Sequence, residues 1–535
     1  DGFGDVAVHS LTALGHSALS GALTADAAGA TAVGRDALGA NTEGQYNTAV
    51  GYKAGEANQT GDGLTAVGYN SLLLSTGNDN TAIGRESLAS NTSGNANTGL
   101  GIWAGHGNAT GSGNTYVGSS AGRGTANQNN SENVAVGYDA MLNVTTGSYN
   151  TAVGYRALDA STTGEKNTAI GNGSLGGIVG GYNNTALGWN AGLSLTTGVG
   201  NVALGLRALD AAAHGESSNI AIGADALGAA KENVADGGSP SHTHTLDDNI
   251  AIGDNAMLGG DLGTTDSALN FKRNIAIGGT AMASTGSNQQ TGTVAIGYGS
   301  LNALTSGADN LAIGYSALDA NTTASNNLAI GRDALGNLNH ANSVRNIAIG
   351  AYSGDGMGTL DGNFDNVFIG YGSGGGTWTG AASKGNVGIG TSTMDANMNT
   401  AYYNTAVGNS ALSGLTSGDD NVAIGGDAGK QLTSGDDNTF VGFQAGTATG
   451  SGSSNVAVGH TALATQANSS AVGNVAVGAS ALKDMNGAHI RNIAIGLAAM
   501  ENASTATTFQ DNVTIGAYAF DDSGSNNQTG TIAIG

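Results

Sequence analysis

The amino-acid sequence predicts an all-β fold: a repetitive parallel β-roll or β-solenoid of about 29 short coils, most of them 17 residues long. A tetrad of Thr, Val, Ile or Leu, then a residue that is small in all but three copies, then Val, Ile or Leu, then Gly occurs 29 times in 535 residues. Its short, nearly constant period means that each unit must stack on its neighbours to bury apolar surface. Helical repeats need about 33 or 34 residues per unit, so we expect the coil to be β.

The first element of each coil is expected to be a short strand. Apolar or β-branched residues flank a small residue, usually alanine, as in residues 151–153. This period of two is typical of a strand with one buried face. We expect the flanking residues to be buried and the alanine to point outward, where it would let another chain approach. The glycine then permits a tight corner.

The second element follows the corner with the pattern x-x-Ala/Ser-Leu/Met, as in residues 155–158, and is expected to be a second short strand or a compact turn. A polar return such as residues 162–164 completes the coil. Asn stands four positions before the glycine in 24 of the 29 copies. These amides can stack between coils as a ladder, or serve as turn residues with left-handed backbone. In the most regular copies, the asparagine and the glycine of the repeat are Asn133 and Gly137, Asn150 and Gly154, Asn167 and Gly171, and Asn184 and Gly188.

Composition excludes several classes of function. The net charge is −24 with only 16 basic residues, which disfavours nucleic-acid partners. The chain has no cysteine for disulfides or metal sites, and no apolar run near the roughly 20 residues that span a bilayer. Without a signal peptide at residues 1–4, we expect an interior piece of a longer protein. No phosphate loop or His-Glu-x-x-His motif occurs, so no enzymatic activity is expected.

The repeat Asn-x-Ala-Val/Ile-Gly-x-x-Ala/Ser-x resembles that of the head domains of trimeric autotransporter adhesins. Similar repeats occur in bacterial proteins that resemble phage tail fibres. The resemblance covers essentially all 535 residues and implies a left-handed parallel β-roll in which three chains pack around a threefold axis. It also implies an extracellular location, at a cell surface or in a virion fibre. The coils are longer here than the usual family repeat, and we expect the extra residues in the polar return.

Irregular spacing marks the candidate sites. We divide the chain into regular coils at 1–227, coils with long inserted loops at 228–273, and coils at 274–535 with a looped region near 351–390. The first loop holds His242 and His244, which in a trimer would offer six imidazoles to a divalent transition metal, or remain idle in solvent. Acidic turns at residues 418–421 and 435–438 could bind calcium, although solvated turns are the simpler interpretation.

Aromatic side chains are the candidate ligand-binding residues. We expect Trp378 and Tyr371 to lie exposed in a polar, glycine-rich loop, where they could stack on a sugar. Trp189 and several tyrosines follow the corner glycine, where they could form a glycan-binding stripe or cover adjacent coils.

Two functions remain open. The leading hypothesis is a non-enzymatic, homotrimeric extracellular fibre or adhesin shaft that presents binding surfaces for attachment to a cell or surface, through a glycan or protein receptor. The alternative is a structural subunit of an extracellular filament or sheath that polymerises end to end. Ice binding would need an outward threonine array, and we expect Thr48, Thr151 and Thr168 to be buried because Val and Ile replace them elsewhere.

Overall fold

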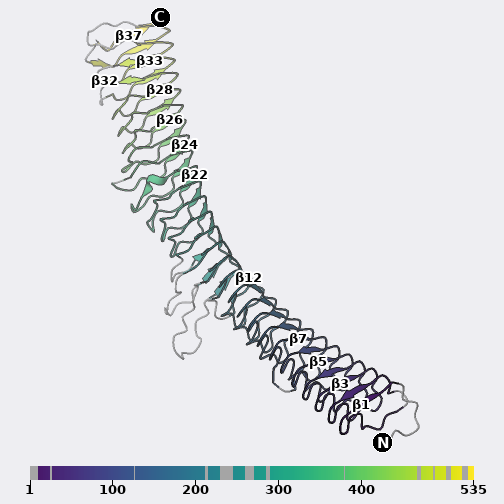
Figure 1. The fold of residues 1–535 in the computed structure, drawn as a ribbon. Coiled ribbons are helices and arrows are strands. Elements are labelled where there is room, and N and C mark those ends of the chain that lie inside the picture. Colours follow the sequence, from purple (N-terminus) through teal and green to yellow (C-terminus); the bar gives the residue numbers. More distant parts are fainter. Residues whose placement is uncertain are drawn as a thin grey trace. The chain divides into compact units, whose positions relative to one another are not determined.

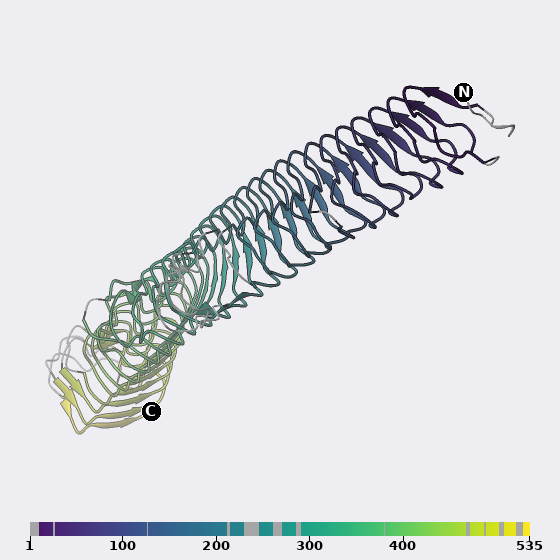
Figure 2. The same cartoon turned by 90° about the horizontal axis from the view of Figure 1, so that it is seen from below.

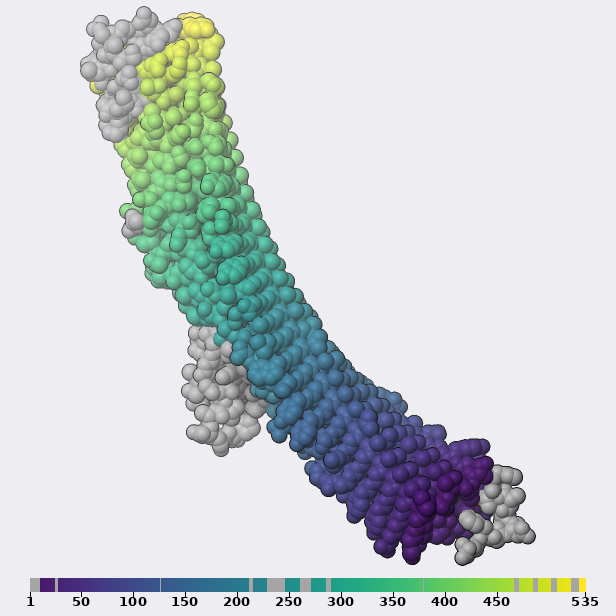
Figure 3. Space-filling view, viewed as in Figure 1, coloured from purple at the N-terminus to yellow at the C-terminus, as the bar shows by residue number. Residues whose placement is uncertain are grey.

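A computed structural model describes residues 10–24, 27–125, 127–210, 215–228, 245–259, 270–284, 290–378, 380–466, 471–485, 488–501, 508–520 and 528–535. The chain separates into two compact units, residues 1–273 and 274–535. Within each unit the fold is a parallel β-solenoid whose regular coils are 17 residues long, and the described residues contain no α-helix (Figure 1). Successive coils occupy successive bands of each unit's surface (Figure 3). The predicted fold class is confirmed.

Each tetrad in the first unit contributes a three-residue strand that pairs in parallel with the strand of the next coil. Thr151 pairs with Thr168 and Val153 with Ile170, so equivalent positions lie directly above one another. Figure 2 shows these strands in a row. The main strands are β1 Thr12–Leu14, β2 Thr31–Val33, β3 Thr48–Val50, β4 Thr65–Val67, β5 Thr81–Ile83, β6 Thr98–Leu100, β7 Thr115–Val117, β8 Val134–Val136, β9 Thr151–Val153, β10 Thr168–Ile170, β11 Thr185–Leu187, β12 Val202–Leu204, β13 Ile220–Ile222 and β15 Ile250–Ile252. A second pair is formed by β14 Thr245–Asp247 and β16 Asn270–Lys272.

The second unit repeats this arrangement, with Val422 opposite Thr439 and Ile424 opposite Val441. Its main strands are β17 Ile275–Ile277, β19 Val294–Ile296, β20 Leu311–Ile313, β21 Leu328–Ile330, β22 Ile347–Ile349, β23 Val367–Ile369, β24 Val387–Ile389, β25 Thr405–Val407, β26 Val422–Ile424, β27 Thr439–Val441, β28 Val456–Val458, β30 Val475–Val477, β33 Ile493–Ile495, β35 Val513–Ile515 and β37 Ile532–Ile534. The return side of some coils adds β18 Gln290–Thr291, β29 Thr465–Gln466, β31 Asp484–Met485, β32 Ala488–Ile490, β34 Thr508–Gln510, β36 Gln528–Thr529 and the 3-10 helix η1 Asp355–Met357.

The core of each coil is narrow and is filled from the middle of the strand. Ala152 is fully buried, whereas Thr151 and Val153 on either side of it are only half-buried and face outward. Our expectation that the alanine points outward is therefore wrong. The short coil closes on so small an interior that two alanines and one leucine, here Ala152, Ala157 and Leu158, supply its apolar side chains, and the β-branched residues remain outside.

The segment after the corner is a compact turn, which decides between the two predicted possibilities. Arg156 and Leu158 have left-handed backbone, with φ of 52° and 54°. At the corner itself, Gly171 has φ of 135°, and a Cβ there would lie 2.3 Å from the carbonyl oxygen of Gly188 in the next coil. Both the backbone angle and the close stacking therefore require glycine.

Three coils carry an aromatic residue in the central strand position, and all three side chains are fully buried: Tyr116, Phe368 and Phe440. The turn position that is leucine in most coils is then glycine. A Cβ at Gly446 would lie 2.4 Å from the Phe440 ring, and one at Gly429 would lie 2.9 Å from it. The large and small residues are thus exchanged between strand and turn while the interior volume is conserved.

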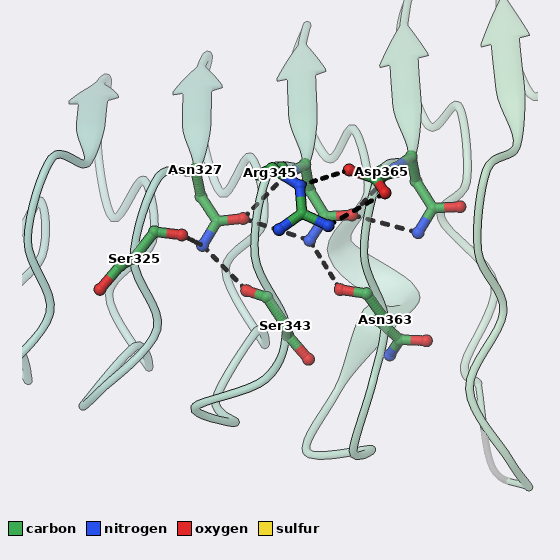
Figure 4. A network of polar contacts seen from close by, with 8 residues as sticks. Ser325, Asn327, Ser343, Arg345, Asn363 and Asp365 are labelled. Carbon is green, nitrogen blue, oxygen red and sulfur yellow. Dashed lines mark hydrogen bonds and ion pairs between the residues drawn. The ribbon is translucent and has the colours of Figure 1, made fainter.

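A ladder of buried asparagines runs beside the main strands. Asn184 donates from its backbone nitrogen and from Nδ2 to Asn167 Oδ1, both at 3.0 Å, and from Nδ2 to the Gly198 carbonyl at 2.7 Å. Asn201 makes the same pair of bonds to Asn184 Oδ1. Figure 4 shows the same ladder around Asn327, beside the ion pair of Arg345 with Asp365. The side-chain amide of each ladder asparagine therefore has hydrogen-bond partners, and its oxygen also accepts from the backbone nitrogen of the next ladder asparagine.

Candidate functional site

The outward side of the main strands carries two parallel rows of side chains, which we call the outer strand face. The first row consists of the first residue of each strand and contains only Thr, Val, Ile and Leu. The second row consists of the third residue and contains only Val, Ile and Leu. Leu187 is 49% exposed and Ile424 is 43% exposed. The chain thus presents an uncharged surface within each unit, along which the second row is continuously apolar.

The outer strand face is regular because the strands pair in register. Val153 lies opposite Ile170 and Ile170 opposite Leu187, so neighbours within a row are about 4.8 Å apart. The main strands place no charged side chain on this face, and the net charge of −24 therefore comes from residues elsewhere on the chain. Contiguous apolar patches of this kind are rare on monomeric soluble proteins and usually mark an interaction surface.

Threonines belong to the first row of this face. Thr48, Thr151 and Thr168 are half-buried and face outward, so the expectation that they are fully buried is wrong. They share their position with Val134, which is 36% exposed, because the position lies on the surface and tolerates either side chain. In the first unit, Thr begins every main strand from β1 to β7 and from β9 to β11, and Val or Ile begins the others.

Aromatic side chains that follow the corner glycine stack on one another. Tyr52 and Tyr69 lie parallel with ring centroids 5.4 Å apart, and Tyr138 and Tyr155 do so at 5.7 Å. Trp189 occupies the equivalent place and is 49% exposed. These rings cover adjacent coils and still leave one face or edge in solvent. Binding of a glycan to this stripe stays a prediction.

The looped region brings Tyr371 and Trp378 into different environments. Tyr371 is well exposed and meets Tyr352 edge-on, with centroids 5.8 Å apart. Trp378 is only 3% exposed and packs edge-on against Phe368 at 5.9 Å. The expected exposure of Trp378 is therefore wrong. The coil is 20 residues long at this point, and the additional residues give the indole room to fold inward.

The predicted metal sites have different outcomes. His242 and His244 lie outside the described residues. In the acidic turns, the Asp419 carboxylate accepts a hydrogen bond from the Tyr402 nitrogen at 2.8 Å, and Asp436 accepts one from the Asp419 nitrogen at 2.9 Å. Burial raises the pKa of Asp419. Over the described ranges, no three His, Asp or Glu side chains gather where they could hold a metal ion.

A second, exposed ladder was not predicted. Two positions before the buried asparagine, an Asn, Asp or Ser side chain accepts a hydrogen bond from the backbone of the preceding coil. The Asn78 nitrogen donates to Asn95 Oδ1 at 2.7 Å, and the Asn95 nitrogen donates to Ser112 Oγ at 3.0 Å. The recurrence of Asn, Asp and Ser at this position is the signal that sequence reasoning could have used.

Comparison with protein-family models finds no match, and comparison with curated proteins finds none either. In the described part of the chain, no helix has the length and apolar character needed to cross a bilayer.

Proposed function

We propose that the chain is a non-enzymatic extracellular fibre or adhesin shaft, at a cell surface or in a virion fibre. In this proposal three copies pack through their outer strand faces and present their remaining surface for attachment to a cell or another surface. The observation that carries the proposal is the uncharged, in-register apolar face along each unit.

The charge distribution supports association through this face. Each copy carries a net charge of −24, so two copies repel one another wherever their acidic residues meet. The outer strand face has no such charges, and its straight rows are complementary to the same rows of another copy. Burying the exposed part of one side chain such as Ile170, which is 38% exposed, contributes on the order of 1 kcal/mol. The contribution recurs in every coil, so a long contact is strong.

The repeat also suits a shaft. Each coil contacts the coil before and the coil after it, so a solenoid extends by adding coils without a change in its cross-section. The resemblance of the repeat to trimeric autotransporter adhesin heads agrees with a threefold arrangement. A binding surface carried on such a solenoid is held away from its point of attachment.

Sedimentation of the native chain tests the number of copies. One chain has a mass of 52.0 kDa, and a trimer has three times that mass. A mass of 52.0 kDa at all concentrations would refute the trimer. A mass that grows without limit as concentration rises would favour the alternative, a filament that polymerises end to end.

Cysteine cross-linking tests which face makes the contact. The chain contains no cysteine, so Ile170→Cys introduces a single thiol on the outer strand face. Oxidation should link pairs of chains, because equivalent residues near a threefold axis come within the roughly 7 Å between Cα atoms that a disulfide allows. Val179→Cys is the matched control, since Val179 is an apolar residue of similar exposure, 43%, outside the strand. Linkage through Val179 but not through Ile170 would overturn the assignment of the face.

A further inference from the structure

A cavity of about 370 Å³ opens beside η1 in the second unit. Its size is at the lower end of the range of small-molecule sites. Both of the 20-residue coils of the looped region contribute to it, together with one residue of the preceding coil. The side chains that line it are those of Asn337, Asp355, Thr359, Thr377 and Trp378. Glycines complete the lining, so part of the backbone is accessible there.

Trp378 contributes its indole N–H as a hydrogen-bond donor. Its backbone nitrogen donates to the carbonyl of Gly356, a lining residue of the cavity, at 2.9 Å. A Cβ on Gly356 would lie 2.9 Å from Trp378 Cδ1, the ring atom next to Nε1. Nε1 itself is buried and has no hydrogen-bond partner among the residues that the structure describes. A buried donor without a partner costs about 1–3 kcal/mol, so an acceptor atom of a ligand would be favoured there.

Asp355 contributes an acceptor that is held in place. Asn337 Nδ2 donates to Asp355 Oδ1 at 2.8 Å and to the Asp355 carbonyl at 3.1 Å. Burial, followed by the charge of Asp333, raises the pKa of the Asp355 carboxyl. A carboxylate has more lone pairs than this one amide satisfies, so it can accept from a ligand hydroxyl. The same negative charge disfavours an anionic ligand.

We propose that this cavity binds a neutral monosaccharide ring, with Trp378 Nε1 donating to a sugar oxygen and Asp355 accepting from a sugar hydroxyl. A hydroxyl group both donates and accepts, so neighbouring hydroxyls of one sugar satisfy the indole and the carboxylate together. Thr359 and Thr377 supply further hydroxyl groups at the wall. The proposal is independent of chain association, because every residue of the site belongs to one chain.

Fluorescence titration tests binding. The chain has three tryptophans, so a Trp103→Phe/Trp189→Phe variant reports on Trp378 alone. Neutral methyl hexosides and methyl N-acetylhexosaminides should give a saturable change in emission for at least one sugar. The matching uronate, which adds only a carboxylate, should bind at least about tenfold more weakly. Absence of a saturable change with every neutral sugar would overturn the proposal and leave a bound water as the partner of Nε1.

Substitutions in the otherwise native chain test the two contacts by calorimetry. Trp378→Phe removes the indole N–H and Asp355→Asn removes the charge, and each should weaken binding by about threefold to tenfold. Asp395→Asn is the matched control, because Asp395 is a partly buried carboxyl with a raised pKa, five positions after a corner glycine like Asp355, but outside the lining of the cavity. Native affinity in Asp355→Asn would overturn the proposal, even if Trp378→Phe failed to fold.

A comparison of two ligands shows whether the cavity binds a free monosaccharide or the terminal residue of a glycan. The ligands are the methyl glycoside that binds most tightly and an oligosaccharide that ends in the same sugar. Equal affinity for the free methyl glycoside and for the oligosaccharide would support recognition of the terminal residue of a glycan. Binding of the methyl glycoside alone would support a free monosaccharide as the ligand. Binding of neither would contradict the proposal.

Discussion

Substitution of Phe440 by alanine should empty the interior of one coil, and leucines at the two facing glycines should refill it. Phe440 is fully buried at the centre of β27. Loss of a buried phenylalanine side chain costs about 3–5 kcal/mol. The ring lies between Gly429 and Gly446, whose Cβ positions would be 2.9 and 2.4 Å from ring carbons. Gly446→Leu in the native chain should therefore destabilise it by about 1–3 kcal/mol through overpacking.

The triple substitution Phe440→Ala, Gly429→Leu and Gly446→Leu restores the arrangement of an ordinary coil. Gly446 has φ of 62° and Leu412, the leucine of an ordinary coil, has φ of 49°, so the backbone at this position already accepts leucine. The ring is the obstacle at Gly446, and at Gly429 the flexible end of Leu412, whose Cδ2 would lie 2.7 Å from the Cβ, must shift as well. We expect the triple variant to lie within about 1.5 kcal/mol of the native chain, as for other volume-conserving exchanges.

Urea unfolding, followed by far-UV circular dichroism, measures these free energies. Amide hydrogen exchange across β26 to β28 localises the effect, since solenoid coils are stabilised mainly by their neighbours. Gly299→Leu is the control for left-handed backbone, because Gly299 has φ of 66° and its nearest neighbour is Ser316 Oγ, 3.6 Å from the Cβ position. A triple variant no more stable than Phe440→Ala, or a neutral Gly446→Leu, would refute the reasoning.

Four further substitutions test the ladder, the corner and the histidine whose pKa is shifted most strongly among the described residues. Asn184→Leu removes the acceptor of Asn201 and should cost about 3–5 kcal/mol in urea unfolding. Thr293→Asn fills a break in the ladder, where Thr293 Oγ1 has no partner among the described residues, and should stabilise the chain by about 1 kcal/mol. Gly171→Ala should lower the thermal midpoint strongly, because the alanine Cβ would clash with the next coil, and an unchanged midpoint would contradict the stacking described above. Burial lowers the pKa of His489 to about 4 from an ordinary value of 6.5, so the unfolded chain takes up this proton first as the pH falls. Stability should fall by about 3 kcal/mol between pH 7 and pH 4 relative to His489→Phe, and equal pH dependence of the two chains would show that burial does not shift the histidine.

The sequence allowed the strands and their register to be predicted, but not the direction of their side chains. A period of two separates Ala152 from Thr151 and Val153 without saying which set is inside. We assigned the larger apolar residues to the core, as in most sheets. The interior of so short a coil is too narrow for them, and only the closed backbone reveals this width.

The candidate sites were harder to predict because they depend on local coil length. Trp378 follows a run of glycines, which suggested an exposed loop, yet two longer coils enclose its side chain. The exchange of leucine for glycine opposite Phe440 was visible in the sequence, but its meaning needs the contact between ring and turn. The repeat therefore specifies the regular coils, whereas the departures from it need the structure.

Because the buried ladder repeats the same hydrogen bonds in every regular coil, a whole coil can be removed or added while the remaining coils keep their contacts. Deletion of residues 167–183 would bring Asn184 directly after the coil of Asn150, whose Oδ1 now accepts from the Asn167 nitrogen at 2.9 Å. Asn184 would then make the same bonds that Asn167 makes now, and the strands on both sides would pair in their old register. Recombination between repeats can therefore shorten or lengthen the protein in steps of one coil without creating a new packing problem. The number of coils can therefore change during evolution without a change in how each coil is stabilised.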